Sequence, residues 1–180
     1  MSGDALRWLT GAAILLLVAA LFVAMARTWR TRTRAQTAAV PPVPVPTGLG
    51  PAVGSWDGFT VATTRADQPL ERITAGGLGF RGRGGVTVHD TGVVLHHAGA
   101  EDRWIAATAV RGADRATAAI DRVVEPGGLV RLRWTVTGAA AATDLDTYFR
   151  FPEGGAAALA ALQGLTTTHE HPHTAGEGTN

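Results

Sequence analysis

One uninterrupted apolar segment, Trp8–Ala26, constrains this chain more than any other feature of its sequence. Its nineteen residues carry no charge, and a helix of that length covers roughly 28 Å, close to the hydrocarbon thickness of a bilayer. A helix from a soluble core would show a polar face, and none appears here. The sequence therefore predicts a transmembrane helix at residues 8–26, preceded by a short tail at residues 1–7.

Positive charge follows the apolar segment directly. The flanking arginines are Arg27, Arg30, Arg32 and Arg34. The positive-inside rule then predicts a single-pass protein of the cell (inner) membrane, with the N-terminus outside and the C-terminal domain in the cytoplasm. The same arginines are suited to contact anionic lipid headgroups, although setting the topology is the simpler role.

A cleaved signal peptide is the alternative for this N-terminal region. Ala24-Met25-Ala26 resembles a cleavage site. The apolar run is long for a signal peptide, and four arginines directly after the cut would oppose export. We therefore expect an anchor, with secretion as the other reading.

Composition excludes several functional classes for the remaining chain. Residues 35–180 carry eleven arginines against fourteen acidic residues, which gives no support to a nucleic-acid partner. Cysteine is absent, which excludes disulfides, thiol catalysis and a cysteine-ligated metal. The sequence indicates no catalytic, cofactor-binding or metal-binding residues, and we expect a protein that is not an enzyme.

A basic and then proline-rich linker is predicted at residues 27–55. It holds five of the nine prolines, and proline fixes φ and removes a backbone donor. Polyproline II is the natural conformation of such a stretch, so we expect a semi-rigid spacer. A ligand for a proline-recognising partner domain is the alternative.

Short strands are predicted within a domain at residues 56–166. Phe59 and Val61 alternate with polar neighbours, as do Val86 and Val88. The clearest alternation places Val130, Leu132, Trp134 and Val136 on one face of a strand. Six or seven such strands predict a mainly β fold, a small antiparallel barrel or sandwich.

A C-terminal helix is expected after Pro152. Leu159, Leu162 and Leu165 recur at helical spacing. The helix is too short to be stable alone, so it is expected to cap the strands. Residues 167–180 are predicted to be a disordered tail, and the alternating His169, His171 and His173 in it are expected to bind metal weakly at most.

The order of strands and helix resembles the pleckstrin-homology-like superfold, and more closely the membrane-anchored PH-like domain proteins of actinobacteria. The residues that carry this resemblance are Gly82-Arg83-Gly84, the turn Val88–Val93, Arg103-Trp104-Ile105, the strand Leu129–Trp134 and the ending Asp146–Arg150. It implies a PH-like antiparallel barrel capped by one C-terminal helix. Eukaryotic relatives often bind phosphoinositides through a basic loop after the first strand. The corresponding stretch here, Arg65–Thr74, contains two arginines and two acidic residues, so it carries no net positive charge.

Arginines at alternating, outward positions form the main candidate binding surface. They are Arg81, Arg83, Arg131, Arg133 and Arg150. If their strands are neighbours, they form one band suited to an acidic peptide, a phosphate or a lipid. The alternative is a solvated face paired with Asp144 and Asp146.

Other motifs have a structural reading as well as a functional one. Asp90-Thr91-Gly92 matches the core of aspartic proteases, which would require a dimer, but it also suits a hairpin turn. His96 and His97 have no acidic residue or nucleophile at an obvious spacing. Trp56, Trp104 and Trp134 suit a barrel core better than a ligand cage.

These features favour a membrane-anchored PH-like module that binds or scaffolds a protein partner at the inner face of the membrane, without catalysis. The alternative is an accessory subunit of a membrane transport or export complex that acts through its span.

Overall fold

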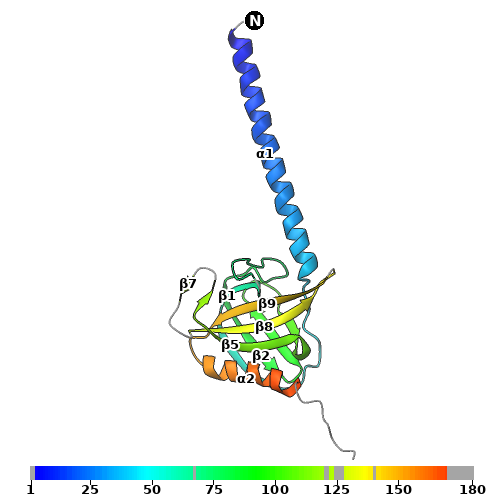
Figure 1. Ribbon diagram of the computed structural model, residues 1–180, viewed down its shortest axis with the longest axis vertical. Coiled ribbons are helices and arrows are strands. Elements are labelled where there is room, and N and C mark those ends of the chain that lie inside the picture. Colours follow the sequence, from blue (N-terminus) through cyan, green and yellow to red (C-terminus); the bar gives the residue numbers. More distant parts are fainter. Residues whose placement is uncertain (1–2, 67, 120–121, 124–127, 140, 170–180) are drawn as a thin grey trace, which may run out of the picture. The chain divides into compact units, whose positions relative to one another are not determined.

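Helix α1, Gly3–Ala39, opens the computed structural model (Figure 1). The structure describes residues 3–66, 68–119, 122–123, 128–139 and 141–169. Within α1, Arg7–Thr31 is long and apolar enough to cross a membrane, properties that a signal sequence would share. The helix continues past the predicted end at Ala26 and stops before Val40-Pro41, because the residue preceding a proline disfavours helical geometry. The chain divides into two compact units, Met1–Gln36 and Thr37–Asn180.

Seven antiparallel strands of the second unit form one sheet in the order β4-β3-β2-β1-β9-β8-β5. Their bounds are β1 Ala52–Arg65, β2 Gly82–His89, β3 Gly92–His97, β4 Arg103–Ala106, β5 Val110–Ala116, β8 Leu129–Thr137 and β9 Ala142–Arg150. A short 3-10 helix, η1, Ala107–Ala109, joins β4 to β5, and β6 Ala118–Ala119 pairs with β7 Arg122–Val123. The predicted mainly β class with a C-terminal helix is confirmed.

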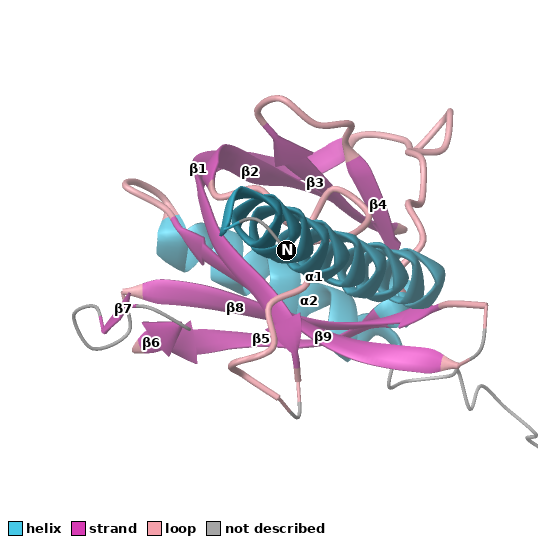
Figure 2. Cartoon of the chain, turned by 90° about the horizontal axis from the view of Figure 1, so that it is seen from above, coloured by secondary structure: helices cyan, strands magenta, loops and turns pink. Residues whose placement is uncertain are grey.

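Strand β1 crosses between the two halves of the sheet, which Figure 2 shows as separate layers. It pairs with β2 up to Thr60 and with β9 from Phe59 onward. A bulge between Thr60 and Ala62 breaks the regular alternation expected at this strand. Before the bulge, β1 turns Gly58 and Thr60 inward, so Thr60 is buried and Phe59 is 43% exposed.

The core follows the predicted alternation of β8 and departs from it at β9. Val130, Leu132, Trp134 and Val136 are all buried. In β9 both faces are covered, since Asp146 and Tyr148 are buried along with Leu145, Thr147 and Phe149. Strand β9 lies between β1 and β8, in the interior of the sheet.

Helix α2, Gly155–His169, covers the sheet mainly at β5 (Figure 1). Leu162 and Leu165 are buried and Leu159 is half-buried, which confirms the apolar face. The helix begins after Gly154, whose φ of +70° lies in the left-handed region that favours glycine. It includes His169, whereas His171 and His173 lie outside the described residues.

Residues 40–50, the strap, pack on the domain and differ from the predicted spacer. Val40 lies in the core with 1% of its surface exposed. The carbonyl of Val43 accepts a 3.0 Å hydrogen bond from the Trp104 backbone N–H, at the edge of the sheet. Val43 and Val45 are half-buried while Pro44 and Pro46 are exposed. An extended proline-rich segment thus covers an edge strand, because it offers carbonyl acceptors but few N–H donors.

Candidate functional site: the arginines of the sheet

The sheet order divides the predicted arginine band into two groups. In β1, Phe59 pairs with Arg83 of β2 on one side and with Arg150 of β9 on the other, whereas Arg131 and Arg133 lie one strand further along, in β8. Arg131 and Arg133 lie in β8 and are called the paired arginines below. Arg81, just before β2, Arg83 in β2 and Arg150 at the end of β9 are called the groove arginines.

The paired arginines are held by carboxylates of both neighbouring strands. Arg131 donates from Nε and Nη2 to the two carboxylate oxygens of Asp114, at 2.8 and 2.7 Å. It also lies 3.6 Å from Asp146, and Arg133 lies 3.7 Å from Asp114. Asp144 instead accepts a hydrogen bond from Thr135. The arginines of β8 therefore lie against Asp114 and Asp146, whereas the sequence-based alternative named Asp144 and Asp146.

Hydrogen bonding and burial shift the pKa values of two groups in this network. The hydrogen bond with Asp114 raises the pKa of Arg131 above its ordinary value. Burial raises the pKa of Asp146, against the opposing effect of Arg131 and Arg133. Asp146 is only 4% exposed, so its charge depends on these two guanidinium groups. Arg131 is thus tied into the sheet, and Asp114 and Asp146 balance the charges of the two paired arginines.

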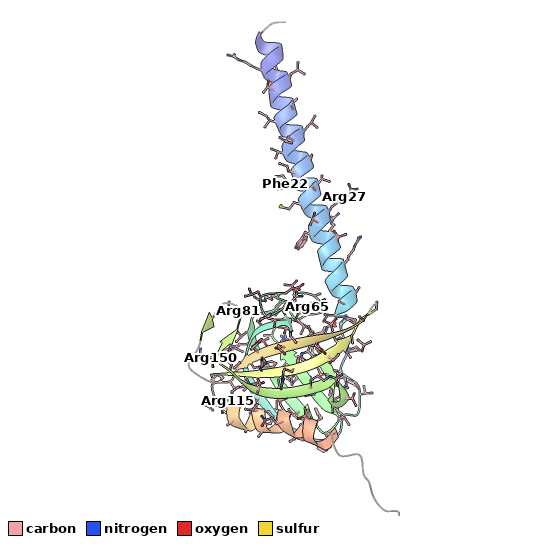
Figure 3. All side chains as sticks on the ribbon, viewed as in Figure 1. Phe22, Arg27, Arg65, Arg81, Arg115 and Arg150 are labelled. Atoms are coloured by element: carbon pink, nitrogen blue, oxygen red, sulfur yellow. The ribbon has the colours of Figure 1, made fainter. Side chains whose placement is uncertain are left out.

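The groove arginines are exposed and surround an apolar hollow. Arg81 and Arg150 line a hollow of about 550 Å³ together with Phe59 and Pro152, and Figure 3 shows both arginines on the same side of the domain. Arg83 lines an adjoining hollow of about 440 Å³ that shares Phe59 and Pro152. We call the two hollows the Phe59 groove. No ion pair joins a groove arginine to any carboxylate of the described residues.

A third kind of arginine, Arg103, has no counterpart in the sequence-based prediction. It is 3% exposed, and Nη2 donates to the carbonyl oxygens of Pro41 and Gly76 at 2.8 and 2.9 Å. Its guanidinium carbon lies 5.6 Å from the centre of the Trp134 ring. Burial lowers the pKa of Arg103 to about 10, so it stays charged at neutral pH. Its position after a Glu-Asp pair gave no signal that it would hold the strap.

His96 has partners that the spacing in the sequence did not reveal. Its Nδ1 lies 2.9 Å from Asp102, and its Nε2 lies 2.8 Å from the Thr87 hydroxyl, which in turn contacts Ser55 at 2.9 Å. These hydrogen-bonded side chains form a continuous polar row across one face of β1, β2 and β3. His97 points to the other face and is buried, and burial and then the charge of Arg103 lower its pKa.

The remaining motifs take structural positions. Asp90 and Thr91 form the two-residue turn between β2 and β3, which confirms the hairpin reading. Trp104 and Trp134 are buried and Trp56 packs against the core, as expected. In the loop after β1, Arg65 pairs with Glu71 at 3.7 Å and Arg72 donates to Gly79.

The arginines that follow the apolar segment all belong to α1. The side chains of Arg27, Arg30 and Arg34 are exposed; that of Arg32 lies outside the described residues. Figure 3 shows Arg27 on the helix.

Comparison with known families gives one match that covers most of the chain. Residues 37–163 match the family described as bacterial PH domain-like. The chain belongs to this family. The matched region begins at Thr37, so the strap is part of the family domain. It ends within α2.

Two other comparisons add little. Among solved structures, a chain from "The 8S snRNP Assembly Intermediate" is similar, with a TM-score of 0.45 and 8% sequence identity over 78% of this chain and 97% of that chain. No curated protein matches the chain.

Proposed function

We propose that this chain is a single-pass inner-membrane protein whose bacterial PH domain-like domain lies in the cytoplasm and recruits a protein partner. The Phe59 groove is the observation that carries the proposal. It combines exposed apolar surface with three arginines that no described carboxylate pairs, and aromatic and arginine residues dominate the binding energy of protein interfaces.

The orientation rests on charge. Arg27, Arg30, Arg32 and Arg34 follow the apolar segment, and only Asp4 and Arg7 precede it. An anchor of this kind raises the local concentration of the domain at the membrane, so that a modest affinity for the partner is sufficient.

The test is site-specific photocrosslinking of the full chain in living cells. A photoreactive residue in place of Phe59 is expected to give a discrete covalent adduct with one protein. The same residue in place of Thr108, which is exposed in η1, is the matched control. Arg81→Glu with Arg150→Glu should abolish the adduct, whereas Arg133→Glu should leave it. Reporters fused at both ends test the orientation, and an external C-terminus would refute it.

Exchange of the anchor separates this proposal from the accessory-subunit alternative. Replacement of Trp8–Ala26 by an unrelated apolar helix should preserve the Phe59 adduct, because the helix serves only as an anchor. Loss of function with the adduct retained would favour an accessory subunit that acts through its span.

A further inference from the structure

The chemistry of the Phe59 groove specifies the kind of protein segment that fits it. Resting on the proposed function, we propose that the groove binds a linear acidic segment of the partner in which a bulky apolar side chain is flanked by carboxylates. The apolar side chain packs against Phe59, and the flanking carboxylates pair with the groove arginines.

The floor of the groove is apolar and concave. Phe59 lies where β1 crosses between the halves of the sheet, on the face opposite the buried Gly58 and Thr60, and it is 43% exposed. Val61, Leu129 and Pro152 complete the wall of the larger hollow. Its volume, about 550 Å³, is within the range of sites that bury a ligand. A surface of this kind loses exposed apolar area when an apolar side chain enters it.

The rim of the groove is positive. Arg81 and Arg150 line the larger hollow, and Arg83 lines the smaller one. Asp57 is the single carboxylate among the described lining residues. Each guanidinium can form bidentate hydrogen bonds with a carboxylate, as Arg131 does with Asp114 on the same sheet. The groove therefore selects anionic groups on both sides of its apolar floor.

An acidic peptide fits this combination better than a lipid headgroup does. A phosphate headgroup needs several converging donors and gains nothing from an apolar floor at Phe59. In an extended peptide, alternate side chains point to the same face, so an apolar residue and acidic neighbours can reach floor and rim together. Flanking charge would also speed association and make binding depend on salt.

A glycine in the wall of the groove provides a clean way to block it. An added Cβ at Gly82 would meet no atom within 4 Å, and the backbone there is outside the left-handed region. Gly82 lines the larger hollow. Gly82→Leu should therefore fill the groove without strain in the fold.

The experiment uses the full chain in detergent micelles and a displayed library of random short peptides. We expect enrichment of peptides with an aromatic or leucine residue between acidic residues. One enriched peptide, measured by calorimetry, should bind at least about tenfold more weakly to Gly82→Leu, Arg81→Gln and Arg150→Gln, a loss of about 1.4 kcal/mol. Arg133→Gln removes the same charge from a paired arginine and should bind normally.

Three results would overturn the inference. They are no enrichment, enrichment of peptides without acidic residues, and binding that Gly82→Leu leaves intact. Phosphatidylglycerol vesicles form a separate arm, and groove-dependent binding to them in place of peptides would assign the groove to a membrane surface. If photocrosslinking at Phe59 gives an adduct in cells but the library yields no acidic peptide, this inference is refuted and the proposal of partner recruitment stands. If acidic peptides bind the groove but no adduct forms in cells, recruitment is refuted and the ligand chemistry inferred for the groove stands.

Discussion

The outer face of β8 and the groove at the end of β9 both carry arginines, and the two regions use them differently. In β8, Arg131 is fixed by two hydrogen bonds to Asp114 and also neutralises the buried Asp146. In the groove, Arg81 and Arg150 border an exposed phenylalanine and meet no carboxylate of the described residues. The same side chain stabilises the fold where its donors are used and is available for binding where they are not.

Removal of a paired arginine should have the largest effect on stability. Arg131→Ala leaves Asp146 buried with one cation fewer, and we expect a loss of about 2–3 kcal/mol in the free energy of unfolding at pH 7. Because the loss comes from unpaired carboxylates, it should shrink as the pH falls and they accept protons, and since the pKa of Asp146 is raised this should begin above about pH 4. Urea unfolding of the full chain, followed by tryptophan fluorescence at pH 7 and at acidic pH, measures the loss of stability and its pH dependence. An unchanged midpoint would place the paired arginines in the same class as the groove arginines.

Arg103 is a buried example of an arginine whose donors are used within the fold. Arg103→Met keeps the volume but removes the donor to Pro41 and Gly76. The strap should then open more often, and hydrogen exchange at the Trp104 N–H, which bonds to Val43, should rise at least about tenfold. Arg111→Met, which removes an exposed arginine bonded to Thr135, is the control. Equal exchange in both variants would mean that Arg103 does not hold the strap.

The charge of Arg103 should also appear in the pH dependence of stability through His97. Burial, and then Arg103, lower the pKa of His97 below 6.5 in the folded state. The unfolded chain therefore binds more protons near this pH, so stability rises with pH through this window and is lost as the pH falls below about 6.5. His97→Gln should flatten the difference in unfolding free energy between about pH 7.5 and pH 5.5. An equal slope in both proteins would contradict this.

The sequence predicted those features that local pattern controls. The apolar N-terminal helix, the alternation of β8, the Asp90-Thr91 turn and the leucines of α2 depend on neighbours within a few residues, and the structure confirms them. Features that depend on pairing between distant strands could not be predicted from the sequence. The gathering of Arg83 and Arg150 around Phe59 depends on β1 lying between β2 and β9. The burial of Val40 depends on contacts with a domain that follows it in the chain.

The Phe59 groove could be only half predicted for the same reason. Arg81, Arg83 and Arg150 were identified as outward, but alternation could not separate them from Arg131 and Arg133. Phe59 is exposed because β1 turns Gly58 and Thr60 inward, and alternation in the sequence does not say which face of a strand is buried. Asp114 and Asp146, which neutralise the paired group, are brought to Arg131 by strand register.

Neutralisation of a groove arginine should have the smallest effect on stability, and this sharpens the comparison most. Arg150→Gln and Arg81→Gln remove no ion pair of the described residues, so the free energy of unfolding should change by less than about 0.5 kcal/mol. Arg131→Gln, on the adjacent strand, is the matched change in the paired group and should cost several times more. The same unfolding curves measure all three variants. If Arg150→Gln were as costly as Arg131→Gln, the groove arginine would be part of the fold, and its exposure could not be attributed to binding. If it is neutral, Arg81 and Arg150 give the isolated chain no measurable stability, and their donors are available to the ligand that we propose.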